Sequence, residues 1–192
     1  LDGSASSDPD STPGTNDDIV LFEWIEDFGS PAELLLGVGE NLTVTLPLGS
    51  HSVTLRVTDS AGETGTDTVQ LSVVDTTPPE IAVSVSPEGL WPPNHKMVEV
   101  AATVVADDIC SEPEVVLTSV TSDEPDDARG GGDGKTKNDI QDVDVGSADF
   151  DVRLRAERAG SGDGRTYTLI YTATDSSGNA ATASASVVVP HN

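Results

Sequence analysis

The sequence predicts an all-β protein built from two tandem β-sandwiches. Several short segments alternate apolar and polar residues with a period of two, which is typical of strands with one buried face. Gly, Pro, Asp and Ser separate these segments, and no long stretch has the 3.6-residue periodicity of a helix. Many short strands joined by such turns are characteristic of sandwiches.

Nine segments carry the strand pattern. The first half of the chain contains three alternating strands, at residues 42–46, 53–57 and 69–73. The second half contains six more, some alternating and some continuously apolar, at residues 81–85, 98–105, 115–120, 150–154, 167–173 and 183–189.

An internal repeat divides the chain into two modules. Residues 55–62 (LRVTDSAG) match residues 171–178 (YTATDSSG), and a terminal strand follows each copy. Both modules therefore end in the same hairpin. Between them lies DTTPP at 75–79, in which two prolines restrict φ and predict a short, stiff linker. We expect one domain at 1–75 and a second at 76–192, within a longer precursor.

The charge of the chain excludes some partners and points to cations. Nine Lys and Arg stand against 34 Asp and Glu, for a net charge of -25. Such a chain lacks the basic surface that nucleic acids require, and no apolar stretch is long enough to span a bilayer. Because apolar content is only 35%, self-repulsion opposes folding unless bound cations offset it.

The single cysteine, Cys110, excludes an internal disulfide and a cysteine-cluster metal site. We expect it to be a small buried hydrophobic residue.

The first module resembles a polycystic kidney disease (PKD) domain. The resemblance is carried by LDGSASSDPD at 1–10, FEW at 22–24 and the repeat at 55–62. IEDFGS at 25–30 departs from the family's usual WDFGDG turn. The resemblance implies an immunoglobulin-like sandwich whose first strand is missing or lies upstream, which leaves an edge that needs cover.

The second module resembles bacterial immunoglobulin-like extracellular repeats of the hyalin-repeat type. Its marks are DTTPP at 75–79, LWPPNHK at 90–96, LRAER at 154–158, GDGRTY at 162–167 and TDSSGN at 174–179. The resemblance implies a secreted or surface-anchored protein in which hydrolase or adhesin domains accompany such modules.

Calcium is the cofactor that the acidic turns indicate, because it takes six to eight oxygen ligands from loops. The resemblance to PKD modules implies a site at Asp8, Asp10 and Asp59, with Asp2 as a further ligand. The alternative is that Asp8 and Asp10 only cap a turn. Repeat symmetry predicts a parallel set that braces the linker, formed by Asp75, Asp107, Asp108 and Asp175. Asp175 is otherwise a turn residue that satisfies its own backbone.

Residues 121–147 form a long acidic, glycine-rich loop that is either functional or a solvated surface segment. We expect the nearby arginines to pair with its carboxylates rather than bind an anionic ligand; they are Arg153, Arg155, Arg158 and Arg165. His95 and His191 lack the spacing of a zinc site, so His95 is expected to pack in a rigid turn.

These features predict a calcium-stabilised extracellular spacer or adhesion module that is not an enzyme. Its partners would be neighbouring modules of the same polypeptide, a polysaccharide or a surface protein. The alternative is a carbohydrate- or matrix-binding accessory module of a secreted hydrolase. Trp24 and Trp91 discriminate between the two: a flat, exposed Trp beside a Tyr favours sugar stacking, whereas two buried Trp favour the spacer.

Overall fold

The computed structural model describes residues 1–9, 11, 17–128 and 132–191. Within these ranges the chain forms eleven strands in three antiparallel sheets and no helix, which confirms the predicted all-β class. None of the described residues form a helix that could cross a lipid bilayer. The chain divides into two compact units, Leu1–Asp75 and Thr76–Asn192, and each is described by itself.

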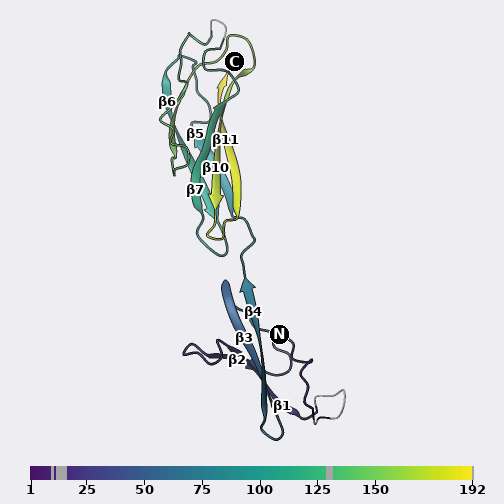
Figure 1. Cartoon of the computed structure of the whole chain (residues 1–192). Helices are drawn as coiled ribbons and strands as arrows, with labels where there is room; N and C mark the ends of the chain where they lie inside the picture. Colours follow the sequence, from purple (N-terminus) through teal and green to yellow (C-terminus); the bar gives the residue numbers. More distant parts are fainter. Residues whose placement is uncertain (10, 12–16, 129–131, 192) are drawn as a thin grey trace. The chain divides into compact units, whose positions relative to one another are not determined.

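The first unit contains one four-stranded sheet with strand order β2-β1-β3-β4 (Figure 1). Its strands are β1 (Ile19–Glu26), β2 (Leu34–Val38), β3 (Gly49–Asp59) and β4 (Thr64–Val73). β3 and β4 contain the alternating segments expected at 53–57 and 69–73. Trp24, Ile25 and Val53 form the buried apolar centre of the sheet.

The strand expected at 42–46 is not formed. Asn41 makes one isolated bridge with Asp2, and the amino group of Leu1 donates to the carbonyl of Leu42 at 2.9 Å. Among the described residues, the backbone of this segment pairs with Leu1 and Asp2, a partner that is too short to build a ladder. The Leu42 side chain instead packs on Gly37, where an added Cβ would lie 2.8 Å from Leu42 Cδ1.

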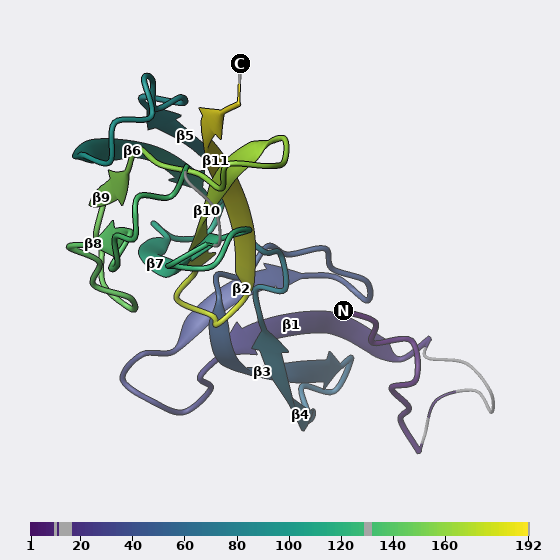
Figure 2. The same cartoon turned by 90° about the horizontal axis from the view of Figure 1, so that it is seen from above.

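The second unit consists of two sheets around one core (Figure 2). The first sheet has strand order β5-β6-β9-β8 and the second β11-β10-β7. The strands are β5 (Glu80–Ser86), β6 (Met97–Asp107), β7 (Glu114–Ser122), β8 (Ile140–Gln141), β9 (Asp151–Arg155), β10 (Gly164–Thr174) and β11 (Ala180–Pro190). Thirteen buried apolar residues drawn from both sheets pack together, which gives this unit the larger core.

Strand β10 determines what faces that core. Every second residue of β10 is buried, from Arg165 through Tyr167, Leu169 and Tyr171 to Ala173. Tyr171 stacks on Phe150 with ring centroids 5.9 Å apart, which closes one end of the core. At the other end the same alternation directs a charged residue, Arg165, into the interior.

Candidate functional site

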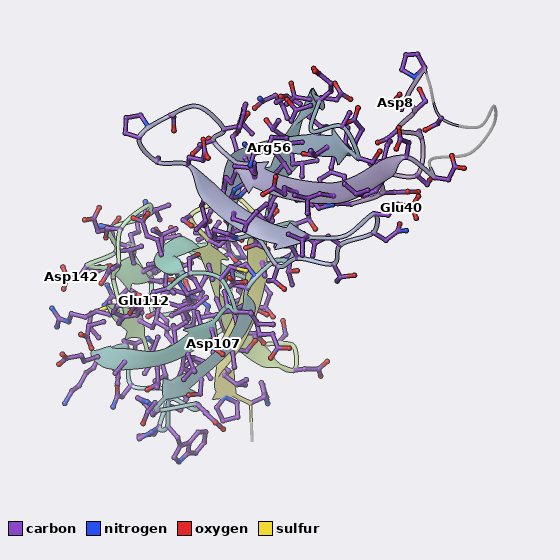
Figure 3. The ribbon with its side chains drawn as sticks, turned by 90° about the horizontal axis from the view of Figure 1, so that it is seen from below. Asp8, Glu40, Arg56, Asp107, Glu112 and Asp142 are labelled. Carbon is purple, nitrogen blue, oxygen red and sulfur yellow. The ribbon has the colours of Figure 1, made fainter. Side chains whose placement is uncertain are left out.

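A cluster of three carboxylates lies at one end of the first unit's sheet. Asp8, Asp18 and Asp59 each offer an oxygen, and these oxygens all lie within 4.8 Å of one another. Asp59 ends β3, and its pairing with Ile19 at the start of β1 brings the preceding residue, Asp18, beside it. Figure 3 shows Asp8 reaching this end of the sheet from the N-terminal segment.

Local hydrogen bonds hold this cluster in place. Asp59 is buried and accepts the backbone N–H of Glu63 at 2.7 Å, while Ser60 donates to the Asp18 carboxylate through its hydroxyl. A cavity of about 210 Å³ lies against the cluster, lined in part by Asp8, Asp59 and Glu63. Three hard oxygen donors around an accessible cavity are the ligand type that calcium prefers.

The structure brings together two of the residues predicted for this site. Asp8 and Asp59 lie together, whereas Asp10 lies outside the described residues. Asp2 is not part of the cluster and accepts the backbone N–H of Ser4 at 2.9 Å, which lowers its pKa below the usual value. Asp18 was missed because residues 19–26 were not recognised as a strand, although an acidic pair directly precedes that apolar run.

The two repeated turns have the same backbone geometry but different side-chain bonding. In the first, the N–H of Asp59 donates to Glu63; in the second, the N–H of Asp175 donates to Asn179. Both carboxylate oxygens of Asp175 accept hydrogen bonds, Oδ1 from the backbone of Ser177 and Asn179 and Oδ2 from the Asn179 amide. Asp175 therefore satisfies its own turn.

The lowered pKa of Asp175 agrees with this role. Burial alone would raise its pKa, but hydrogen bonds from the side chain and backbone of Asn179 and from Ser177 outweigh it and hold the pKa below its usual value.

The other aspartates of the predicted second set, apart from Asp75, lie at strand-end and turn positions of the second unit. Asp107 is the exposed last residue of β6, and Asp108 caps the following turn by accepting the N–H groups of Cys110 and Ser111. Within the described ranges, neither Asp107 nor Asp175 belongs to a group of three ligand-bearing side chains. Asp75 is the half-buried last residue of the first unit, and its part in a linker site stays a prediction.

Cys110 also differs from its expected environment. It is exposed rather than buried, because it lies in the loop after β6, next to Ile109, which is 95% exposed.

A network of buried charged side chains lies in the second unit. Arg165 is fully buried and donates to Asp133 at 2.7 Å, to Glu124 at 3.2 Å and, at shorter range, to Asp139. Desolvation alone would lower its pKa, but bonds to Tyr167, Asp139 and Glu124 raise it, so the guanidinium stays charged. The expected pairing of arginines with carboxylates of residues 121–147 is present here.

Arg155 extends this network toward Glu157 and His95. Its Nε lies 3.0 Å from Asp139 Oδ1, and its Nη1 donates to the carbonyl of His95 at 3.1 Å. Glu157 Oε2 accepts from the hydroxyl of Thr136 and lies 3.0 Å from His95 Nδ1. His95 is thus the hydrogen-bonding turn residue that its motif predicts.

The other arginines behave differently. Arg153 lies 3.6 Å from Asp142, an exposed pair at the edge of the sheet, where Figure 3 shows Asp142 projecting from the ribbon. Arg158 donates to three backbone carbonyls, of Ala159, Pro190 and His191, and so ties the C-terminal end of β11 to the loop after β9.

Burial shifts the pKa values of two acids in this network. Desolvation raises the pKa of both Asp133 and Glu157 above the usual carboxyl values. By contrast, Asp126 accepts the backbone N–H groups of Asn138 and Asp139, which lowers its pKa. These bonds order the described part of residues 121–147 against β8 and β9.

The two tryptophans have opposite environments. Trp24 is 5% exposed, and its indole N–H donates to the carbonyl of Gly39 at 2.9 Å. Trp91 is 61% exposed, but both tyrosines, Tyr167 and Tyr171, are fully buried. The chain therefore has an exposed Trp without the accompanying Tyr that a stacking platform was expected to include.

Comparison with known proteins adds little to this geometry. No protein-family model matches the chain, and no curated protein matches it. Among solved structures, the chain is similar to one described as fibronectin(III)-like modules of Clostridium thermocellum CbhA, with 10% identity and a TM-score of 0.35. The match covers 90% of this chain and 79% of that one. At this level of similarity, the fold rests on the sheets described above.

Proposed function

We propose that this chain is a calcium-stabilised, non-catalytic spacer or adhesion module of a larger bacterial protein that is secreted or displayed at the cell surface. The observation that carries the proposal is the convergence of Asp8, Asp18 and Asp59 at one end of a thin sheet. The motif resemblance of residues 1–10 and 55–62 to PKD modules supports the extracellular setting.

The mechanism is electrostatic. A net charge of -25 opposes compaction of both units, and the first unit has only a small apolar centre to resist it. A calcium ion held by three carboxylates offsets their mutual repulsion and fixes the N-terminal segment to the ends of β1 and β3. The ion thus takes the place of a disulfide, which a chain with one cysteine cannot form.

Calorimetric titration of the full chain with calcium tests this directly. Asp59→Asn keeps an oxygen that can accept the N–H of Glu63 but removes the charge, so we expect it to weaken calcium binding at this cluster by at least about tenfold. Asp67→Asn, at an exposed aspartate of β4, is the matched control and leaves the affinity unchanged. Equal affinities in wild type and Asp59→Asn would contradict the proposal.

A carbohydrate- or matrix-binding accessory role is the second candidate, favoured by the exposed indole of Trp91. Stacking of a sugar on this ring would change its fluorescence, whereas Trp24 is shielded. A polysaccharide that alters the emission of wild type but not of Trp91→Ala would support this role. An unchanged emission across a panel of cell-wall and plant polysaccharides removes it.

A further inference from the structure

Three acids of the second unit meet in its interior. Asp133 precedes β8 in the glycine-rich loop, Asp139 directly precedes β8, and Glu157 follows β9. Each offers an oxygen that lies within 4.8 Å of the other two, and their exposed fractions are 0%, 2% and 0%. The pairing of Ile140 with Leu154 explains the convergence, because it places residues 139 and 155–157 side by side.

Two oxygens of this triad have no hydrogen-bond partner. Asp133 Oδ1 receives Arg165, but Asp133 Oδ2 is buried and unpartnered. Glu157 Oε2 accepts from Thr136 and faces His95, but Glu157 Oε1 is likewise buried and has no hydrogen-bond partner, although Arg155 Nε lies 3.8 Å away. An unsatisfied buried carboxylate oxygen is costly, so both atoms indicate a missing partner.

The charge of the network specifies what kind of partner is missing. Four largely buried carboxylates, those of Glu124 and the triad, face two guanidinium groups, those of Arg155 and Arg165. With all four acids ionised and His95 neutral, these side chains carry two more negative than positive charges. One divalent cation neutralises this excess, whereas a water molecule supplies hydrogen bonds but no charge.

The donor atoms favour a hard cation. All three acids present oxygen, and the one nearby imidazole nitrogen, His95 Nδ1, already faces Glu157 Oε2. Carboxylate-rich sites of this kind suit calcium, whereas zinc prefers nitrogen and sulfur ligands. A cavity of about 210 Å³ borders the network, with Asp126, Asp139 and Arg165 in its wall.

We propose that Asp133, Asp139 and Glu157 bind one divalent cation of the calcium type inside the second unit. The ion ties the glycine-rich loop to β8 and to the end of β9, and it gives residues 132–141 their fixed position. This site is independent of the Asp8–Asp18–Asp59 cluster and of the function proposed above.

Terbium luminescence in the full chain isolates this site. The hydroxyl of Tyr167 accepts a hydrogen bond from Arg165 Nη1 at 3.1 Å, so Tyr167 lies within the network and can sensitise a bound lanthanide. The measurement uses chelator-treated Asp18→Asn/Asp59→Asn protein, in which the first cluster is disabled. We expect tyrosine-sensitised emission that saturates at one ion per chain and that calcium displaces.

Two near-isosteric variants in this background test the ligands. Glu157→Gln and Asp133→Asn each remove one charge, and each is expected to weaken terbium binding by at least about tenfold, the loss typical even for partners outside a coordination shell. Asp142→Asn, at an exposed acid just after β8, is the control and keeps the wild-type affinity.

The results of these experiments distinguish a metal ion bound by the three acids from a proton bound by them. If no terbium binds, or if binding survives unchanged in both Glu157→Gln and Asp133→Asn, the cation site is excluded. If the Glu157→Gln protein is more stable than its parent in chelator and calcium stabilises neither, the network holds a proton instead and the proposal fails. Failure of the wild-type protein to bind calcium at the Asp8–Asp18–Asp59 cluster would contradict the proposed function but not this site.

Discussion

Arg165 and Asp133 form an ion pair of 2.7 Å in which neither side chain is exposed to solvent. The pair joins the strand at the centre of the second unit's three-stranded sheet to the glycine-rich loop. A buried pair of this kind is costly to break, because removing one partner leaves the other charge uncompensated.

Replacement of Arg165 by Met is therefore expected to destabilise the second unit by about 3–5 kcal/mol. Arg153→Met is the matched control, since Arg153 and Asp142 are an exposed pair 3.6 Å apart worth less than about 1 kcal/mol. Urea denaturation of both variants gives the two free energies of unfolding. Similar losses in both would show that burial does not set the importance of Arg165.

Gly134→Ala tests the packing of the loop on His95. Gly134 has φ of +69°, and an added Cβ would lie 2.7 Å from His95 Nδ1, so strain and overlap add. We expect a loss of about 2–4 kcal/mol in the free energy of unfolding, as the sum of a left-handed backbone cost and overpacking. Gly146→Ala, with φ of +89° and open space around the new Cβ, is expected to show the backbone cost alone. A smaller loss for Gly134→Ala than for Gly146→Ala would contradict the packing.

His51 is expected to make the stability of the first unit depend on pH. Its Nδ1 lies 2.5 Å from Glu26 Oε1 and its Nε2 lies 2.9 Å from the carbonyl of Pro47, so both ring nitrogens face acceptors. Only the charged imidazolium donates to both. Hydrogen bonds to Glu26 and then Pro47 accordingly raise the pKa of His51 above its usual 6.5.

The direction of the pH dependence of stability follows from this raised pKa. Because the folded-state pKa is the higher one, the stabilisation is fully present below about pH 6.5 and is lost as pH rises through the folded-state value. Thermal unfolding between about pH 5.5 and 8.5 should show this loss in wild type, and His51→Gln should flatten the curve. An NMR titration in which His51 has a pKa below 6.5 would contradict it.

Substitution of Trp24 should lower the free energy of unfolding, whereas substitution of Trp91 should leave it nearly unchanged. Trp24→Ala removes a buried indole and its hydrogen bond to Gly39, with an expected loss of about 3–5 kcal/mol. Trp91→Ala removes a ring that is 61% exposed and is expected to change the free energy of unfolding by less than about 0.5 kcal/mol. Urea denaturation distinguishes the two, and a large loss for Trp91→Ala would mean that its ring packs rather than presents a surface.

The alternation of apolar and polar residues predicted much of this fold. Residues 53–57, 69–73 and 167–173 lie in β3, β4 and β10, and in β10 every second residue is buried, as the alternation predicts. An alternating pattern alone did not suffice at 42–46, where no strand among the described residues pairs with the segment. β1 and β2 were missed because their near-continuous apolar runs carry little alternation.

The sequence predicted residues of the candidate sites only where a local motif contains them. Asp8 and Asp59 were predicted from the resemblance of their motifs to PKD modules, while Asp18 depends on the pairing of β1 with β3. For the buried network, the pairing of Arg155 and Arg165 with acids of the loop was predicted, but not the triad with its unpartnered oxygens. Extending the alternation of β10 back from Tyr167 to Arg165 was the one sequence signal that this arginine faces inward.

Thermal unfolding of the full chain in excess calcium and then in chelator tests calcium stabilisation most directly. An ion that binds only the folded state adds about 2.7 kcal/mol at a hundredfold excess over its Kd. We expect the unfolding midpoint of the first unit to rise by about 10–20 °C with calcium, and Asp59→Asn to cut that rise by half or more. The same midpoint in calcium and in chelator would contradict it.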